Sequence, residues 1–440
     1  MSESFALGRR LGGNALAKLG SELVGRVATF GLSLLIANRL GEQAFGAYSY
    51  GLALGFVLAQ IADLGLQVLA ARDIAIAGRA AQPLVAGALR LKLWLALPVV
   101  GLLVLLRNGR APTEQAGLLL LGLAMLAQTF LEFAAYIYRG QQRVIREAWL
   151  LTAARLLTAF LAGAALVAGG GLLEVGWAYL VAISAVAVWA LRRLDGAGWF
   201  QRTAGILPAK SGQGARGPGY SALLRQALPL GIAIFLSIAY TRVAVFLLEF
   251  RLGAVAVAQF SAAQRLVEPA QIVPAALLAA VFPAFSQAVH SVRARERRQA
   301  HRLALGSSLL LALAGAGVAL FFWFAAPWLI PTLYGEPFVE SVPVLRLLGL
   351  SALPAFINYN LTHILIARGQ QLYSSLFVGL MLAIHSALSW VFIPILGAVA
   401  PAISVTFAEL LLLLCCTATL FLTRGSESRT AVSGTSNQPV

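Results

Sequence analysis

The stretch LALGSSLLLALAGAGVALFFWFAAPWLI, residues 303–330, contains 28 residues and no charged side chain. About 20 consecutive apolar residues are enough for an α-helix to cross the hydrocarbon core of a bilayer. In lipid the backbone groups must be hydrogen-bonded within the protein, and a helix satisfies them within the segment itself. This stretch therefore predicts a transmembrane α-helix.

Similar apolar stretches recur along nearly the whole chain of 440 residues, which is 60% hydrophobic and 11% charged. An average soluble domain is roughly a quarter charged. We therefore predict an all-α integral membrane protein with twelve transmembrane helices and no soluble domain of ordinary size. The expected spans are 16–38, 45–71, 83–106, 115–138, 147–169, 172–191, 222–250, 255–289, 303–330, 341–366, 371–394 and 397–422.

The positions of arginine and lysine test this count, because short cytoplasmic loops of membrane proteins carry an excess of both. With the N-terminus in the cytoplasm, 24 of the 33 cations are assigned to the inside, and 4 fall in outside loops. The 24 include Lys18, Arg90, Lys92 and Arg225, which lie near the cytoplasmic ends of their expected spans. A wrong helix count would scramble that alternation. Both termini are therefore predicted to be cytoplasmic. The other cations lie within spans: Arg26, Arg155, Arg242, Arg265 and Arg346.

The formal net charge of +16 bears on the partners of the protein. In a soluble protein it would suggest nucleic acid. Here the excess fits cytoplasmic loops in contact with anionic lipid headgroups, and no basic stripe is interleaved with aromatic residues as in single-strand-binding proteins. We expect membrane lipids as partners, no nucleic acid, and no cofactor or metal, because no Cys or His spacing fits a metal site.

The glycine-rich and basic stretch 195–220 divides the predicted spans into two sets of six. Such a composition indicates a flexible cytoplasmic linker. It predicts an N-terminal six-helix lobe at 1–194, a C-terminal six-helix lobe at 221–424 and a disordered cytoplasmic tail at 425–440.

Short motifs repeat between the two predicted lobes. Arg39-Leu40-Gly41 matches Arg251-Leu252-Gly253 at an offset of 212 residues, and Arg139-Gly140-Gln141-Gln142 matches Arg368-Gly369-Gln370-Gln371 at an offset of 229. Both halves start inside and contain six spans, so the repeat is expected to be parallel, with a pseudo-two-fold axis along the membrane normal. Transporters built in this way bind substrate near the midplane between lobes that rock.

Leu40-Gly41, Phe45-Gly46 and Tyr48, followed by Asp63-Leu64-Gly65-Leu66 and Arg72-Asp73, form a pattern that resembles the opening of polysaccharide-exporting flippases. These belong to the multidrug/oligosaccharidyl-lipid/polysaccharide exporter superfamily. The resemblance covers the twelve-span layout through short motifs, and it implies a V-shaped two-lobe fold. It also implies translocation of a polyprenyl-diphosphate-linked oligosaccharide to the outer leaflet of the bacterial cytoplasmic (inner) membrane, for surface polysaccharide biosynthesis. Glycosyltransferases and a polymerase of the same pathway would then be partners.

Arginines inside the spans are the first candidates for substrate binding. A charge at the bilayer centre costs about 2.5–3.5 kcal/mol on insertion scales, so it should face a cavity or a partner. Arg26 would meet a diphosphate, because guanidinium groups fit phosphate oxygens; the alternative is a pair with Glu22, four residues earlier. Arg242 has no carboxylate three or four residues away, which leaves it able to point into a cavity.

Three further residues complete the candidate substrate site. Arg265 has Glu268 three residues later as an alternative partner. Arg72, at the expected cytoplasmic mouth, either captures the headgroup or snorkels to the interface. Asn358 either touches sugar hydroxyls or bridges two helices.

Three carboxylates lie within apolar spans, namely Asp63, Glu132 and Glu409. Each is a candidate to bind a coupling proton or sodium ion. Structural roles compete with this interpretation: packing at the Asp63-Leu64-Gly65 motif, and anchoring of an adjacent helix by Glu409.

Three functions were compared. A lipid-linked oligosaccharide flippase needs a cationic cavity, whereas a cation-coupled drug antiporter of the same superfamily needs an acidic one. The arginines in the spans favour an anionic headgroup. A membrane polysaccharide polymerase needs a long outer loop for its catalytic groups, and the longest outside loops here have about ten residues. We therefore expect a transporter rather than an enzyme.

Overall fold

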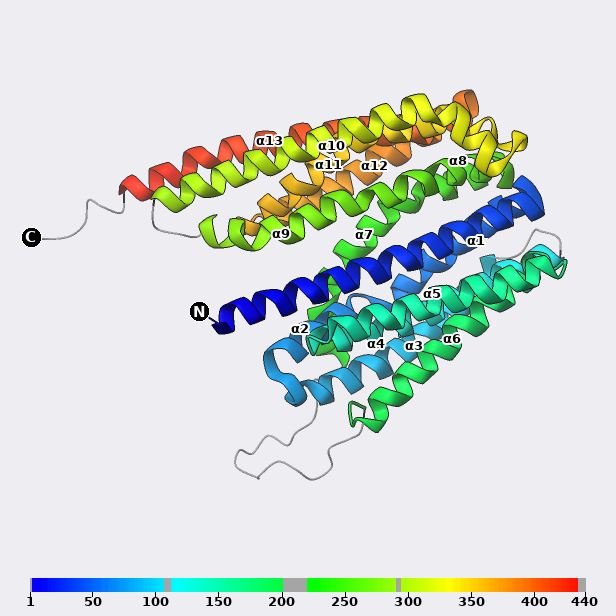
Figure 1. Ribbon diagram of the computed structural model, residues 1–440, viewed down its shortest axis with the longest axis horizontal. Helices are drawn as coiled ribbons and strands as arrows, with labels where there is room; N and C mark the ends of the chain where they lie inside the picture. Colours follow the sequence, from blue (N-terminus) through cyan, green and yellow to red (C-terminus); the bar gives the residue numbers. More distant parts are fainter. Residues whose placement is uncertain (1, 107–111, 201–219, 290–293, 434–440) are drawn as a thin grey trace, which may run out of the picture. The chain divides into compact units, whose positions relative to one another are not determined.

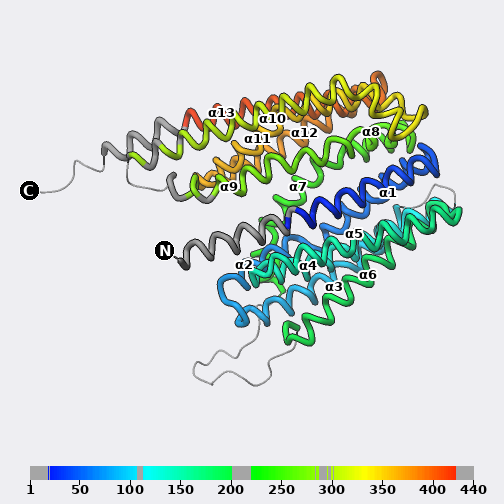
Figure 2. Tube along the Cα trace, viewed as in Figure 1, coloured from blue at the N-terminus to red at the C-terminus, as the bar shows by residue number. Residues whose placement is uncertain are grey.

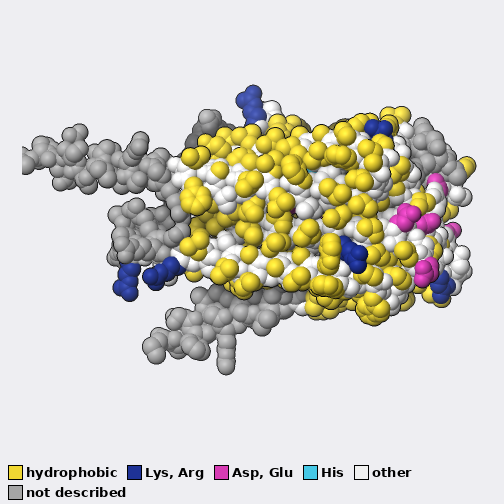
Figure 3. Space-filling view, turned by 90° about the horizontal axis from the view of Figure 1, so that it is seen from above, with side chains coloured by type: hydrophobic (Ala, Val, Ile, Leu, Met, Phe, Trp, Pro, Cys, Tyr) yellow, Lys and Arg dark blue, Asp and Glu magenta, His cyan; other side chains and the backbone are white. Residues whose placement is uncertain are grey.

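The computed structural model describes residues 2–106, 112–200, 220–289 and 294–433. These residues form α-helices and short 3-10 helices, with no β-strand among them. Hydrophobic side chains cover the middle of the face drawn in Figure 3, and acidic side chains gather at one end of it. Many large apolar side chains point outward, including Phe160, Trp94 and Leu422. Helices with apolar outer surfaces are those of a protein that lies in lipid, so the multi-pass membrane fold is confirmed.

The chain forms two compact units, Met1–Ile238 and Ala239–Val440. The elements of the first unit are α1 (Ser2–Asp63), α2 (Leu66–Ala77), η1 (Gly78–Ala81), α3 (Gln82–Leu106), α4 (Pro112–Gly140), α5 (Val144–Val167), α6 (Leu172–Gly196) and the first part of α7 (Tyr220–Leu252). Helices α4, α5 and α6 run side by side (Figure 1).

The second unit contains the rest of α7. It is followed by α8 (Ala254–Val267), η2 (Glu268–Gln271), α9 (Ile272–Val289), α10 (Ala294–Tyr334), η3 (Glu336–Phe338), α11 (Ser341–Ala367), α12 (Gln371–Leu396) and α13 (Val399–Ser433). Helix α11 packs against α10 and α13 at the centre of this unit. A buried core lies between them, with Leu365, Ala408 and Cys416 fully covered.

Helix α1 consists of two helices divided at Gly41, which has φ 77° and ψ 178°. Before this glycine the chain packs on α5, where the Thr152 hydroxyl donates to the Ser21 carbonyl at 2.9 Å. After it the chain packs on α4, where Gly55 meets Gly122. The chain therefore reverses direction at Gly41, as Figure 2 shows. Gly253, its partner in the sequence repeat, has nearly the same conformation (φ 82°, ψ −170°).

By length and composition, eleven helices among the described residues could cross a membrane. Twelve were expected. The difference arises because the expected spans 16–38, 45–71 and 83–106 fall into two long segments, Gly20–Asp63 and Leu66–Leu106. The first of these contains the reversal at Gly41. The twelve-helix count and the pseudo-two-fold axis stay predictions.

The boundary between the two units lies inside α7, whereas the sequence placed a linker at 195–220. The first part of α7 belongs with the first unit because it packs closely there. A Cβ atom added at Gly65 would lie 2.8 Å from the backbone nitrogen of Gly231, and one added at Gly87 would lie 3.2 Å from the Leu223 side chain. The greater part of the predicted linker, 201–219, lies outside the described residues.

Helix α13 ends at Ser433, within the segment 425–440. The disordered tail expected over 425–440 stays a prediction. Extending an existing helix gains one hydrogen bond for each residue fixed, and no proline interrupts this one after Pro401. Residues 434–440 lie outside the described part of the chain.

Candidate functional site

A buried ion pair lies inside the first unit. The Lys92 ammonium, on α3, is 2.5 Å from Oδ1 of Asp63 at the end of α1, and both side chains are fully buried. The other carboxylate oxygen of Asp63 accepts a hydrogen bond from the backbone N–H of Gly65 at 3.2 Å. The ammonium also lies over the rings of Phe130 and Phe133, at 5.6 and 5.9 Å from their centres. The pair therefore has the additional contacts that a buried charge requires.

The sequence had assigned Lys92 to a cytoplasmic segment, and this assignment is wrong. The residue lies within α3, ten positions from its first residue, and is buried among helices. Its flanking residues, Leu91 and Leu93, were the signal that could have placed it there. A cation can occupy this position because Asp63 neutralises it.

Glu132 lies beside this ion pair. It accepts a hydrogen bond from Nε2 of Gln128, one turn earlier on α4, at 3.2 Å. It is close enough to interact electrostatically with Lys92, Asp63 and Arg155. Two of the three predicted coupling carboxylates thus lie together, and we call Asp63, Lys92, Glu132 and Arg155 the charge cluster.

Arg26 adjoins the charge cluster through Arg155. The Arg155 side chain packs on α1, where a Cβ atom at Gly25 would lie 2.9 Å from its Cδ. It is within electrostatic range of Arg26, Glu22 and Glu132. Within the described part of the chain the Arg26 guanidinium makes no ion pair or hydrogen bond, so the alternative pair with Glu22 is not formed. A partly buried cation thus stands beside a second cation, without a direct counter-ion.

The second unit contains a different carboxylate site. Glu409, on α13, is 9% exposed. Its Oε1 accepts a hydrogen bond from the Tyr240 hydroxyl at 2.9 Å, and its Oε2 accepts one from Nδ2 of Asn358 at 2.7 Å. Asn358 also donates to the backbone carbonyl of Glu409 at 2.7 Å. The sequence predicted Asn358 and Glu409 as separate candidates, and the structure brings them together. Tyr240, which the sequence analysis did not single out, joins them. We call these three residues the Glu409 network.

Further polar groups extend the Glu409 network along α12. The His385 ring lies 5.7 Å from the Tyr240 ring, nearly edge-on. Its Nδ1 is 3.5 Å from the Ser389 hydroxyl, which donates to Ser404 at 3.0 Å. His385, Ser389 and Ser404 thus form a second polar group, which meets the Glu409 network through the ring contact with Tyr240.

The remaining predicted arginines have different surroundings. Nη1 of Arg242 is 3.4 Å from Oε1 of Glu268, in η2, so Arg242 has a counter-ion that lies 26 residues away in the sequence. Arg265 is partly buried in the last turn of α8. Arg72 is exposed on α2, and its Nε lies 3.1 Å from Oδ1 of the adjacent Asp73.

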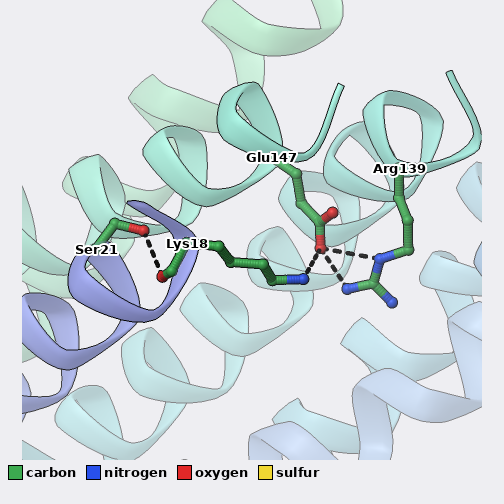
Figure 4. A network of polar contacts seen from close by, with 4 residues as sticks. All are labelled: Lys18, Ser21, Arg139 and Glu147. Carbon is green, nitrogen blue, oxygen red and sulfur yellow. Dashed lines mark hydrogen bonds and ion pairs between the residues drawn. The ribbon is translucent and has the colours of Figure 1, made fainter. Parts of the chain in front are cut away.

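A third carboxylate, Glu147, is buried at the end of the first unit where α4 ends and α5 begins. Its Oε1 accepts a hydrogen bond from Nε of Arg139 at 2.9 Å, also contacts Nη2 of that arginine, and lies 3.6 Å from the Lys18 ammonium. Figure 4 shows the carboxylate between the two cations, with the Ser21 hydroxyl on the Lys18 carbonyl. This network ties α1, α4 and α5 together.

Comparison with known protein families gives a direct assignment. Residues 11–289 match the family described as polysaccharide biosynthesis protein. The chain belongs to this family. A comparison of the chain with curated proteins finds no match.

Several solved structures resemble this chain in fold. An inward-facing multidrug resistance MATE family transporter of the MOP superfamily is 15% identical, with a TM-score of 0.71, over 96% of this chain and 99% of that one. The lipid II flippase MurJ, in an inward closed conformation, is 12% identical, with a TM-score of 0.72, over 92% and 87%. A MOP superfamily transporter from Pyrococcus furiosus is 16% identical, with a TM-score of 0.62, over 94% of each chain.

The solved structures confirm the all-α fold that the sequence predicted, and the family match agrees with the resemblance to polysaccharide exporters. The solved structures that share this fold are those of transporters and of a flippase. At these identities the solved structures establish the fold alone, so the substrate must be argued from the residues of this chain.

Proposed function

We propose that this protein is a flippase that carries a polyprenyl-diphosphate-linked oligosaccharide across the bacterial cytoplasmic membrane, for surface polysaccharide biosynthesis. The observation that carries the proposal is Arg26, a cation within a membrane helix that has Arg155 nearby and no direct counter-ion among the described residues. Two neighbouring guanidinium groups repel each other, and a diphosphate would relieve that repulsion. The membership of the polysaccharide biosynthesis family supports the same substrate class.

The proposed mechanism is alternating access between the lobes 1–194 and 221–424, with both termini in the cytoplasm. Arg72 meets the headgroup at the cytoplasmic mouth, and Arg26, Arg242 and Arg265 hold the diphosphate while the prenyl chain stays in lipid. Asn358 contributes to sugar contacts through its amide oxygen, which accepts no hydrogen bond from a described residue, because both bonds donated by its Nδ2 go to Glu409. Glycosyltransferases and a polymerase of the pathway are the proposed partners on either side of the step.

Replacing Arg26 by alanine should reduce flipping of a polyprenyl-diphosphate-linked oligosaccharide in proteoliposomes about 10- to 150-fold. This range corresponds to the roughly 1.5–3 kcal/mol that a hydrogen bond to a charged group contributes. Arg26→Lys should recover only part of the rate, because an ammonium lacks the fork that fits two phosphate oxygens. Arg39→Ala, an exposed position on the same long helix, is the matched control and should flip normally.

Arg242→Ala tests the second arginine in the same assay. Its expected loss is smaller than that of Arg26→Ala, because Glu268 already compensates the charge of Arg242. Normal flipping by both alanine variants, with protein inserted at the wild-type level, would exclude this substrate site.

A second candidate function is cation-coupled antiport of a drug or another small molecule. The observation that favours it is the Glu409 network, in which the carboxylate is held by two neutral donors and no cation among the described residues pairs with it. Such a carboxylate can exchange a proton or a sodium ion. Asp63, by contrast, is already neutralised by Lys92, and Glu132 shares that environment.

Glu409→Gln should remove the dependence of transport on an imposed proton or sodium gradient, because the amide cannot take up either ion. Gln can keep its amide oxygen as the acceptor for Nδ2 of Asn358 and donate from its NH2 group to the Tyr240 oxygen, because a hydroxyl can also accept, so insertion and thermal stability in detergent should change little. Glu336→Gln, at an exposed acidic position in η3, should leave the gradient dependence intact. Gradient-driven efflux of organic cations, together with no flipping of the lipid-linked oligosaccharide, would establish the antiporter instead of the flippase.

A further inference from the structure

A cavity of about 870 Å³ lies at one end of the first unit, where α4 ends, α5 begins and α6 ends. This is the end that the distribution of positive charge predicts to be cytoplasmic. A second groove, of about 670 Å³, adjoins it along the last turns of α6. Volumes of several hundred Å³ are typical of sites for small molecules and headgroups.

The cavity is strongly basic. Arg143, Arg146 and Arg193 line it, and its lining within the described residues contains no carboxylate. Arg192 lines the adjoining groove, which shares Arg193 with the cavity. Arg143 is also the N-cap of α5 and makes no side-chain cap there, so the positive end of this helix opens at the same place. The positive charge of the cavity therefore favours an anionic ligand.

The walls of the cavity are aromatic and apolar. Trp149 and Trp189 line it and are 63% and 54% exposed. The Arg193 guanidinium lies over the Trp189 ring, 5.2 Å from its centre. Tryptophan beside arginine is typical of the membrane interface, where the ring lies at the level of lipid headgroups. Leu150 and Val186 continue the lining as apolar surface. A ligand that fits must therefore be both anionic and apolar.

Gln141 adds an independent indication that an acceptor belongs in the cavity. It lies in the turn after α4 and is part of the lining. Its Nε2 is buried and donates to no group in the described structure. A buried amide donor without an acceptor costs about 1–3 kcal/mol, and the oxygens of a phosphate group would satisfy it.

The segment that follows the cavity in the sequence does not supply this anion. Residues 201–219 carry Arg202, Lys210 and Arg216 and contain neither aspartate nor glutamate. Charge complementarity therefore favours a lipid of the membrane over the chain's own continuation.

We propose that this cavity binds an anionic glycerophospholipid of the cytoplasmic leaflet. The phosphate lies among Arg143, Arg146 and Arg193 and accepts from Gln141. The acyl chains follow the apolar surface between Trp149 and Trp189. The site belongs wholly to the first unit and is separate from the residues proposed to hold the transported diphosphate.

The test uses the full-length protein in vesicles of phosphatidylcholine that contain increasing amounts of either brominated phosphatidylglycerol or brominated phosphatidylcholine. Bromine quenches the fluorescence of nearby tryptophan residues, so a brominated lipid bound beside Trp149 and Trp189 lowers their fluorescence. Quenching by the anionic lipid should saturate at a mole fraction at least tenfold lower than quenching by the zwitterionic lipid. Polyprenyl diphosphate is absent from these vesicles, so the result does not depend on the transported substrate.

Matched variants test whether this cavity causes the preference for the anionic lipid. The triple variant R143Q/R146Q/R193Q should lose the preference for the anionic lipid. The triple variant R90Q/R225Q/R302Q removes the same charge from exposed positions expected on the same side and should keep it. Trp149→Phe and Trp189→Phe alter no charge and should remove most of the saturable quenching. These two variants test the proposal even if R143Q/R146Q/R193Q fails to insert into the membrane.

Three results would overturn the proposal. Equal quenching by the two lipids would show that no headgroup is selected. Loss of the preference in R90Q/R225Q/R302Q would show attraction by overall charge rather than a site. Reversal of the preferential quenching by millimolar inorganic phosphate, at constant ionic strength, would show that the cavity binds a free anion rather than a lipid.

Discussion

Lys92→Met should lower the free energy of unfolding by about 3–5 kcal/mol, the loss expected when one partner of a buried ion pair is removed. The Asp63 carboxylate, fully buried, would keep the Gly65 N–H as its remaining donor. Glu132 would lose a nearby cation at the same time. Unfolding in mixed micelles with increasing denaturing detergent, followed by tryptophan fluorescence, measures this change.

Two further variants separate charge from packing. Asp63→Asn should cost less than Lys92→Met, because Glu132 stays near the ammonium. The double variant Asp63→Asn/Lys92→Met should recover most of the stability, since replacing a buried pair by neutral groups is often nearly neutral. Lys18→Met is the matched control: Lys18 is 30% exposed and Glu147 keeps Arg139, so a change of about 0–1 kcal/mol is expected. If Lys92→Met and Lys18→Met lowered the free energy of unfolding equally, the burial of Lys92 would not explain the cost of its removal.

Gly65→Ala should be the most damaging glycine substitution tested, at about 2–6 kcal/mol. Two terms contribute: about 1–3 kcal/mol of backbone strain at φ 81°, and about 1–3 kcal/mol of overpacking. The added methyl group would lie 2.8 Å from the Gly231 nitrogen and 2.9 Å from the Ala227 carbonyl oxygen, both backbone atoms of α7. The same detergent titration gives the measurement.

Gly41→Ala tests backbone strain without overpacking. Gly41 has a similar φ of 77°, but a Cβ atom there would meet nothing within 4 Å. Only the strain of about 1–3 kcal/mol is expected. The strain at Gly41 is at least as large as that at Gly65, because its ψ of 178° lies in a region that is essentially restricted to glycine, whereas Gly65 has ψ 6°. A loss at Gly65→Ala smaller than that at Gly41→Ala would therefore show that the close approach of α7 contributes nothing.

The fold was largely predictable because apolar length is a local property of the sequence. Stretches such as 303–330 identify a membrane helix without knowledge of its neighbours. The reversal at Gly41 was signalled too, by the Arg-Leu-Gly motif that recurs at Gly253. The exact helix count, the lobe boundaries and the orientation of the termini remain predictions.

The pairing of charges was not predictable, because it depends on how each helix is rotated about its axis. Arg242 lacks a carboxylate one turn away, yet it meets Glu268 from η2. Lys92 was counted as a topology marker, although it is the counter-ion of Asp63. Asn358 and Glu409 were singled out as polar residues in apolar spans, but their contact across 51 residues came from the structure. Local spacing reveals pairs within a helix and not those between helices.

The ion pair of Asp63 and Lys92 also constrains how the chain is inserted during synthesis. A lone lysine or aspartate costs about 2.5–3.5 kcal/mol when its helix leaves the translocon for lipid. The two residues are 29 positions apart, on consecutive segments, so both leave the ribosome within a few seconds at typical synthesis rates. The segments are therefore expected to enter the bilayer together as a helical hairpin, already neutralised, and a translation pause between them should increase misinsertion of the second.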